Sequence, residues 1–207
     1  MVNKLKSIST VQVLAVILIL IGLVIMIRYG IGTFNAYREV EYAYRNNFDA
    51  GNLDTDLMRP WMSMRYVAVA YTVPIEYLFS ELGIELERRN GNASLDDLND
   101  EYFRGQRAEQ GYPIILDKLS AAILAYRENP VPTGLRQNGV RPWMNVQYIA
   151  NSTGIPTEYL FEQIGIAIDD NAFIPLDRLS DEVRYPRGPR GLVEALQHAV
   201  DAYKAAP

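Results

Sequence analysis

RPWMSMRYVAVAYTVPIEYLFSELGI, at residues 59–84, decides the fold of this chain because a second version of it, RPWMNVQYIANSTGIPTEYLFEQIGI, stands at residues 141–166. Aligned at an offset of 82 residues, the two stretches are identical at 13 of 26 positions. Several of the other pairs exchange one apolar side chain for another, as at Val67 and Ile149. Self-similarity at a fixed offset indicates one folding unit used twice. We therefore predict two tandem copies of one small fold.

Proline and glycine mark a pair of short helices inside each copy. In the first copy we predict a helix over 62–71, a turn, and a second helix that starts at Pro74 and stops at Gly83. Proline suits the first turn of a helix, where its missing N–H would have no partner, and glycine suits the left-handed residue after the last turn. The second copy repeats these signals at Pro156 and Gly165, and adds Gly154 where the first copy has Thr72.

The remainder of each copy corresponds more loosely. SLDDLNDEY (94–102) matches PLDRLSDEV (175–183), and both copies end in an amphipathic helix. No alternating strand pattern is found, so the predicted class is all-α: a single N-terminal transmembrane helix and two tandem helix-turn-helix-like repeats. The predicted organisation is an anchor at 1–31, an amphipathic juxtamembrane helix and linker at 32–56, repeat 1 at 57–130, a linker at 131–140 and repeat 2 at 141–207.

An uncharged run of apolar residues at 8–27 precedes the repeats. At about 1.5 Å per residue, such a run reaches the ~30 Å thickness of a bilayer core. A cleaved signal peptide is the alternative, with Phe34-Asn35-Ala36 imitating its cleavage site, but the run is longer than such peptides use. We expect a retained single-pass anchor in a bacterial cell membrane, in contact with lipid through residues 8–27. The basic N-terminus favours an extracytoplasmic position for the repeats.

Charge and composition narrow the classes of partner. The first 31 residues carry Lys4, Lys6 and Arg28 and no acid, so the rest of the chain has 17 basic and 25 acidic side chains, a balance of −8. An acidic surface is repelled by phosphate backbones, which makes nucleic acid an unlikely partner. With no cysteine and only His198, the chain cannot form a Cys/His metal site or catalytic pair by itself. We predict no catalytic residue, no metal and no cofactor.

Aromatic and arginine residues are the candidate partner contacts, since these side chains dominate binding hot spots. Trp61 and Trp143 stand at equivalent places; each is either a structural anchor of its repeat or an exposed hot spot. Three bulky neighbours on a short helix cannot all face one core, so part of each Tyr-Leu-Phe run is predicted to meet a partner. The candidates are Arg59, Trp61, Tyr77 and Phe79 in repeat 1; Arg141, Trp143, Tyr159 and Phe161 in repeat 2; and the basic loop residues Arg184, Arg187 and Arg190.

The spacing Tyr148-Ile149-Ala150 to Gly154-Ile155-Pro156 and Leu160 resembles the core of a helix-turn-helix. The fuller pattern, RPWM followed by Ile-Ala, Ile-Pro, EYLF and Leu/Ile-Gly-Ile, is similar to helix-turn-helix-like modules appended to bacterial membrane proteins, including redox-associated ones. The resemblance covers most of 57–207. It implies a compact helical fold. The second helices, PIEYLFSEL and PTEYLFEQI, carry no Lys or Arg with which to read bases.

These patterns predict a non-catalytic, membrane-anchored interaction module: an adaptor or accessory subunit of a membrane complex, with self-association as a further possibility. A membrane-tethered DNA-binding regulator is the alternative from another class. The anchor would restrict diffusion to the bilayer and so raise encounters with other membrane proteins.

Overall fold

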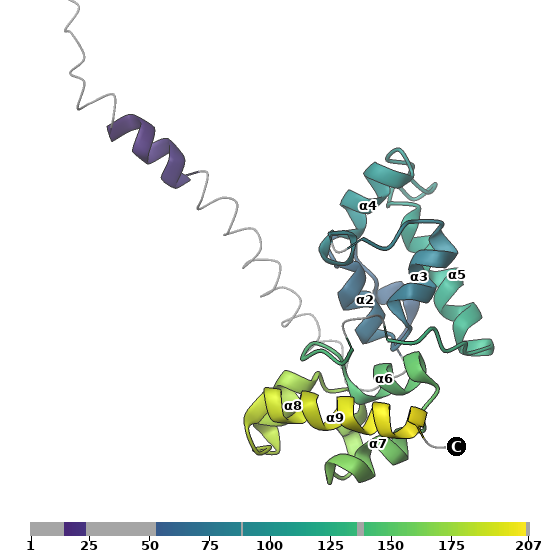
Figure 1. The fold of residues 1–207 in the computed structure, drawn as a ribbon. Coiled ribbons are helices and arrows are strands. Elements are labelled where there is room, and N and C mark those ends of the chain that lie inside the picture. Colours follow the sequence, from purple (N-terminus) through teal and green to yellow (C-terminus); the bar gives the residue numbers. More distant parts are fainter. Residues whose placement is uncertain (1–14, 24–52, 88, 136–138, 206–207) are drawn as a thin grey trace, which may run out of the picture. The chain divides into compact units, whose positions relative to one another are not determined.

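The computed structural model describes residues 15–23, 53–87, 89–135 and 139–205 (Figure 1). The chain divides into two compact units, Met1–Tyr42 and Ala43–Pro207. In the first unit, residues 15–23 form a helix with exposed side chains. Within the four described ranges, no helix combines the length and apolar character needed to cross a membrane. The rest of the predicted span at 8–27 and the amphipathic helix predicted within 32–56 lie outside the described residues, apart from 53–56.

The second unit is helical, which confirms the all-α class for the part of the chain that the structure describes. Besides helices, the described residues form only isolated β-bridges, Ser63 with Ser94 and Arg107 with Pro113. Repeat 1 contains η2 (Thr55–Leu57), α2 (Met64–Ala70), α3 (Ile75–Leu82), η3 (Asn90–Asn92), α4 (Leu95–Tyr102) and α5 (Ile115–Glu128). Repeat 2 contains α6 (Val146–Thr153), α7 (Thr157–Ile164), η4 (Asp169–Phe173), α8 (Leu176–Glu182) and α9 (Gly188–Ala205).

The two RPWM segments make the same backbone hydrogen bonds. The Met62 carbonyl accepts from the Leu95 N–H at 2.9 Å, and the Met144 carbonyl accepts from the Leu176 N–H at 2.8 Å. Helices α2 and α6 also begin alike, because Ser63 and Asn145 each accept from the N–H three residues later. Such N-caps satisfy a donor that the first helical turn leaves unpaired. The local structure of the first copy therefore recurs in the second.

Left-handed residues end the helices at equivalent positions. Gly83 and Gly165 follow α3 and α7 with φ of 65° and 68°, as the sequence predicts. The turn after α2 is also left-handed, with Thr72 at φ 54°, although its counterpart after α6 is Gly154 at φ 72°. A β-branched residue is disfavoured in that region, so the surrounding contacts must hold Thr72 there.

Each repeat closes its core with its last helix. Helix α5 packs on α3 and α4, and α9 packs on α7 and α8 (Figure 1). The same aromatic contact recurs in both repeats: the Tyr77 and Tyr126 rings lie 5.0 Å apart, and the Tyr159 and Tyr203 rings lie 4.9 Å apart, both edge-on. Edge-on ring pairs add to the stabilisation that burial already gives.

Helix α6 joins the repeats by bonding to the α2–α3 turn of repeat 1. The Asn151 side-chain amide donates to the Thr72 carbonyl at 2.6 Å, and that of Asn145 donates to the Val69 carbonyl at 3.3 Å. The Tyr148 hydroxyl accepts from the Ile75 N–H, the first of α3, at 3.2 Å. In the opposite direction, the Tyr126 hydroxyl of α5 donates to the Asn151 carbonyl at 3.2 Å. Repeat 2 thus bonds backbone groups around this turn, although the Val69 carbonyl also accepts from the Thr72 N–H within repeat 1.

We expect Asn151→Ala to destabilise the full chain by about 1–3 kcal/mol, because the part-buried carbonyl of the left-handed Thr72 loses its donor. Thermal unfolding followed by circular dichroism measures the change. Asn92→Ala is the matched control, since Asn92 is exposed and its side chain makes no hydrogen bond to any described residue. An equal effect of the two substitutions would show that Asn151 does not hold the turn.

Candidate functional site

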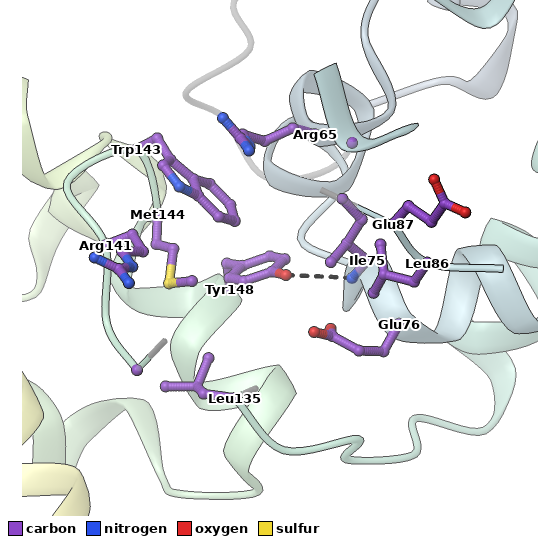
Figure 2. A pocket seen from close by; sticks show the side chains of 12 residues that line it. Arg65, Ile75, Glu76, Leu86, Glu87, Leu135, Arg141, Trp143, Met144 and Tyr148 are labelled. Carbon is purple, nitrogen blue, oxygen red and sulfur yellow. Dashed lines mark hydrogen bonds between the residues drawn. The ribbon is translucent and has the colours of Figure 1, made fainter. Parts of the chain in front are cut away.

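A cavity of about 520 Å³ lies at the junction of the two repeats (Figure 2). Its volume falls within the range of ~300–1,000 Å³ that small-ligand sites occupy. The repeat 1 wall includes Arg65 from α2, Glu76 from α3 and Glu87 from the segment before η3; the other wall includes Arg141, Trp143 and Tyr148. Elements that are far apart in sequence therefore build one site, and they are held together by the bonds of α6 to the α2–α3 turn.

Trp143 forms an aromatic wall of the cavity. Its ring lies 5.6 Å from the Tyr148 ring in an edge-on arrangement, and the Arg65 guanidinium carbon lies 5.0 Å from the Trp143 ring centroid. A guanidinium over an indole face is attracted by the negative charge of the ring face. Figure 2 shows Arg65 reaching from repeat 1 towards Trp143 of repeat 2. This contact fixes the indole at the junction while leaving it only half-buried.

Tyr148 is the buried polar group of the cavity. Burial raises the pKa of its phenol far above the usual value, and the nearby Glu76 carboxylate raises it further. Burial also raises the pKa of Tyr126, on α5, to about 12. Tyr148 therefore stays neutral at physiological pH. Its hydroxyl acts as the acceptor for the first N–H of α3.

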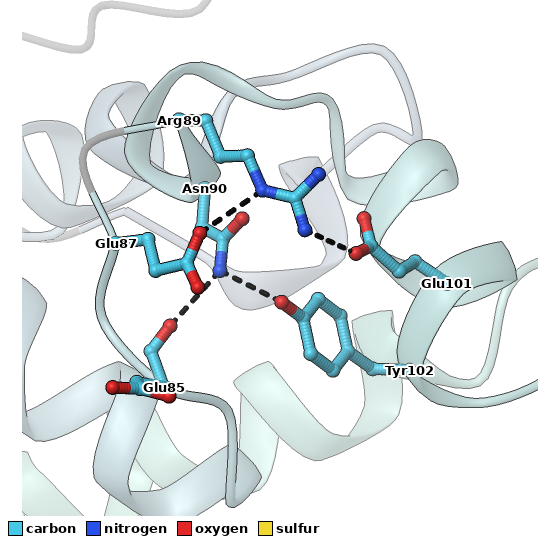
Figure 3. A network of polar contacts seen from close by, with 6 residues as sticks. All are labelled: Glu85, Glu87, Arg89, Asn90, Glu101 and Tyr102. Carbon is cyan, nitrogen blue, oxygen red and sulfur yellow. Dashed lines mark hydrogen bonds and ion pairs between the residues drawn. The ribbon is translucent and has the colours of Figure 1, made fainter.

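Glu87 belongs to a neighbouring polar network, in which it shares the Arg89 guanidinium with Glu101 (Figure 3). Arg89 bonds Glu87 through Nε at 3.1 Å and Glu101 through its terminal nitrogen at 2.6 Å. The Asn90 side-chain amide donates to the Glu85 carbonyl and the Tyr102 hydroxyl, both at 2.9 Å. The ion pairs are exposed and contribute little stability. They do offset the charge of Glu87 at the cavity wall.

Arg141 and its counterpart Arg59 differ in what they bind. The Arg59 guanidinium donates to the carbonyls of Asp56 at 2.6 Å and Met58 at 2.8 Å. The Arg141 side chain is exposed at the cavity, and no hydrogen bond or ion pair joins it to a described residue. Its backbone is held in place because the Gln197 side chain of α9 accepts from the Val140 N–H at 2.8 Å. Identical RPW segments thus carry different arginine environments.

Some of the predicted partner contacts are buried in the structure, and others are partly exposed. The prediction is wrong for Phe79 and Phe161, which are each only 1% exposed and pack in the cores of their repeats. They lie about 200° round their helices from Tyr77 and Tyr159, on the faces of α3 and α7 that are turned into the repeat cores. Tyr77 and Tyr159 keep part of their surface exposed while packing on α5 and α9. Trp61 lies half-buried, 6.3 Å from the Tyr66 ring, and does not line the cavity.

Two of the three predicted basic residues are paired with α9: Arg187 directly precedes this helix and Arg190 lies in its first turn. Arg187 and Arg190 both pair with Glu194, at 2.8 and 2.9 Å, and these arginines lower the pKa of the Glu194 carboxyl. Arg184 is exposed. Among the described residues, no group of His, Asp or Glu side chains is placed to hold a metal ion. The loop therefore retains less net positive charge than its sequence indicates.

Sequence reasoning missed Arg65, Tyr148 and Gln197 as residues that build the site. Tyr148 has a signal in hindsight, since it is a tyrosine inside an otherwise apolar helix face. Arg65 and Gln197 have none, because their sequence neighbours do not indicate which part of the other repeat they meet.

No protein-family model, curated protein or solved structure matches this chain. The resemblance to helix-turn-helix-like modules of membrane proteins therefore stays a prediction.

We expect the chain to lose stability as the pH rises above about 10, the ordinary pKa of an unfolded tyrosine. Tyr126 and Tyr148 have raised pKa values in the folded state, so folding holds protons that the unfolded chain has already released. Their stabilising effect is complete below pH 10 and is lost as the pH rises towards about 12. Melting temperatures measured across this range test the expectation. The melting temperature of the Tyr148→Phe variant should fall less steeply with pH than that of the Tyr203→Phe variant. Equal slopes for the two variants would contradict the role of Tyr148.

Proposed function

We propose that this chain is a non-catalytic, membrane-anchored interaction module, an adaptor or accessory subunit of a membrane complex, and that its partner docks at the cavity between the repeats. One observation carries the proposal: a half-buried tryptophan and an exposed arginine, Trp143 and Arg141, line an open cavity at the junction of the repeats. Trp, Tyr and Arg are the side chains that contribute most to protein–protein binding.

The construction of the junction supports a binding role. The Trp143 indole is fixed by the Tyr148 ring on one side and by Arg65 from the other repeat. A side chain that is already held in place loses little conformational entropy when a partner covers it. Around the indole, the cavity is lined by apolar side chains such as Met144 and Ile75 and by the Tyr148 phenol, with Arg141 exposed where a partner would dock. A binding surface is the use that this arrangement supports best.

The membrane part of the proposal is supported by the uncharged run at 8–27. Residues 8–27 would contact lipid in a bacterial cell membrane as a single pass, with the repeats on the extracytoplasmic side. Tethering confines the junction near the bilayer surface, where other membrane proteins carry their own exposed segments.

A membrane-tethered DNA-binding regulator is the weaker proposal. The left-handed turns at Thr72 and Gly154 favour a helix-turn-helix comparison. Against it, α3 carries Glu76 and Glu81 and no basic residue, and the first N–H of α3 is bonded to repeat 2. A recognition helix reads bases with cations and amides from its N-terminal turns. Here that end of α3 is acidic and faces the other repeat.

We expect Trp143→Ala to abolish co-purification of the partner when the full chain is isolated in mild detergent, with a loss of more than about tenfold, as for a hot-spot residue. Co-migrating chains identified by mass spectrometry give the measurement. Trp61→Ala is the matched control, because Trp61 is the equivalent half-buried residue beside a tyrosine ring but does not line the cavity.

Melting temperatures of both variants separate misfolding from lost contact. Retention of the partner by folded Trp143→Ala, or equal loss from both tryptophan variants, would contradict docking at this cavity.

Topology reporters fused after residue 205 should report an extracytoplasmic location, since the basic N-terminus is expected to stay inside. An alkaline phosphatase fusion should be active and a green fluorescent protein fusion dark. The opposite pattern would contradict the proposed orientation and would restore the regulator as a competitor.

A further inference from the structure

The starting point is the unequal use of two identical arginines. Arg59 donates to two backbone carbonyls, whereas the Arg141 guanidinium makes no hydrogen bond or ion pair with any described residue and is exposed where the cavity opens. A guanidinium presents five donors in a planar fork that matches a carboxylate. Arg141 therefore offers a binding group that its counterpart in repeat 1 does not.

The other charges around the cavity have internal neighbours. Glu87 is bonded to Arg89, and Arg65 lies over the Trp143 ring. Glu76 lies on the repeat 1 wall, near the Tyr148 hydroxyl, where it contributes to the raised pKa of that phenol. Of the described residues that line the cavity, Arg141 is thus the cation whose charge is left for a ligand. In the view of Figure 2, Arg141 and Glu76 lie on opposite sides of Tyr148.

Apolar groups stand next to this charge. Met144 lies beside Arg141 and the Trp143 indole, and Leu135 also lines the cavity (Figure 2). A ligand that fills the site would place an apolar side chain against these groups and an anion against the guanidinium. Such a combination of one charged and several apolar contacts is usual in specific sites.

We propose that the cavity binds a carboxylate that stands beside a large apolar side chain, as presented by an acidic peptide segment of a partner protein. This inference rests on the proposed docking function and specifies the chemistry of the partner. The carboxylate belongs either to a free chain end or to an Asp or Glu side chain. Both sources present the same group to Arg141.

The experiment uses the full chain in detergent with Trp61→Phe, which leaves Trp143 as the single tryptophan, since the sequence has two. Trp143 fluorescence then reports binding at the cavity. The probes are N-acetyl-phenylalanine, its amide N-acetyl-phenylalaninamide, the cation phenethylamine, and inorganic phosphate. A further probe, acetyl-Glu-Phe-amide, carries its acid on a side chain.

We expect the acid to bind about tenfold more tightly than the amide, the difference that a charge-assisted hydrogen bond gives. Arg141→Ala should remove this preference without lowering the melting temperature, and Arg141→Glu should favour phenethylamine instead. Arg190→Ala is the control for an exposed arginine that does not line the cavity, and it should keep the preference. Tighter binding of acetyl-Glu-Phe-amide than of N-acetyl-phenylalanine would identify an Asp or Glu side chain as the source of the carboxylate. Tighter binding of N-acetyl-phenylalanine would identify a free chain end.

Three results would overturn the proposal: equal binding of acid and amide, tighter binding of phenethylamine than of the acid to unaltered Arg141, or tighter binding of phosphate than of the acid. These results are separate from the docking test. Loss of the partner from Trp143→Ala together with equal acid and amide binding would leave docking in place and remove the carboxylate. Tighter binding of the acid than of the amide, with no partner lost from Trp143→Ala, would leave the carboxylate site in place and remove docking.

Discussion

The arrangement of the repeats depends on how α6 satisfies the backbone of the α2–α3 turn. That turn contains a left-handed Thr72, whose conformation is unfavourable for a β-branched residue. Amide donors from Asn145 and Asn151 reach two of its carbonyls, and the Tyr148 hydroxyl accepts the first N–H of α3. A buried polar group without a partner costs more than a hydrogen bond gains. The junction is therefore specified by polar groups as well as by apolar packing.

This junction is heterologous. At the offset of 82 residues, Asn145 corresponds to Ser63 and Asn151 to Val69, and the groups they bond belong to Val69 and Thr72. A two-fold arrangement would need Asn151 to bond the Ser63 position, but it bonds Thr72 instead. The two repeats consequently contact each other through non-equivalent surfaces. This explains how the two RPW segments, identical in sequence, come to differ in environment, with one at the cavity and the other outside it.

Much of the local fold was predictable because it follows from short-range rules. Proline before a helix, Gly83 and Gly165 after it, and the repeated RPWM segment all act within a few residues. The left-handed Thr72 was not predictable, since threonine alone argues against that conformation and the contact that holds it comes from Asn151. Burial of Phe79 and Phe161 was likewise not predictable, because no local pattern says which face of a short helix packs into its repeat. Among the candidate site residues, Trp143 and Arg141 line the cavity, while Arg65 and Gln197 needed the tertiary structure.

Arg59 and Arg141 show how far sequence identity can mislead about role. Both follow the same motif rules and begin the same RPWM segment, yet one guanidinium caps backbone carbonyls and the other is exposed. The difference arises from what precedes each motif. Residues 54–58 form η2 and its caps, which turn carbonyls towards Arg59. Before Arg141, a left-handed Gly139 and the Val140 bond to Gln197 direct the chain along α9 instead. A duplicated motif can therefore keep its structural part in both copies while one copy alone acquires a charge available to a ligand.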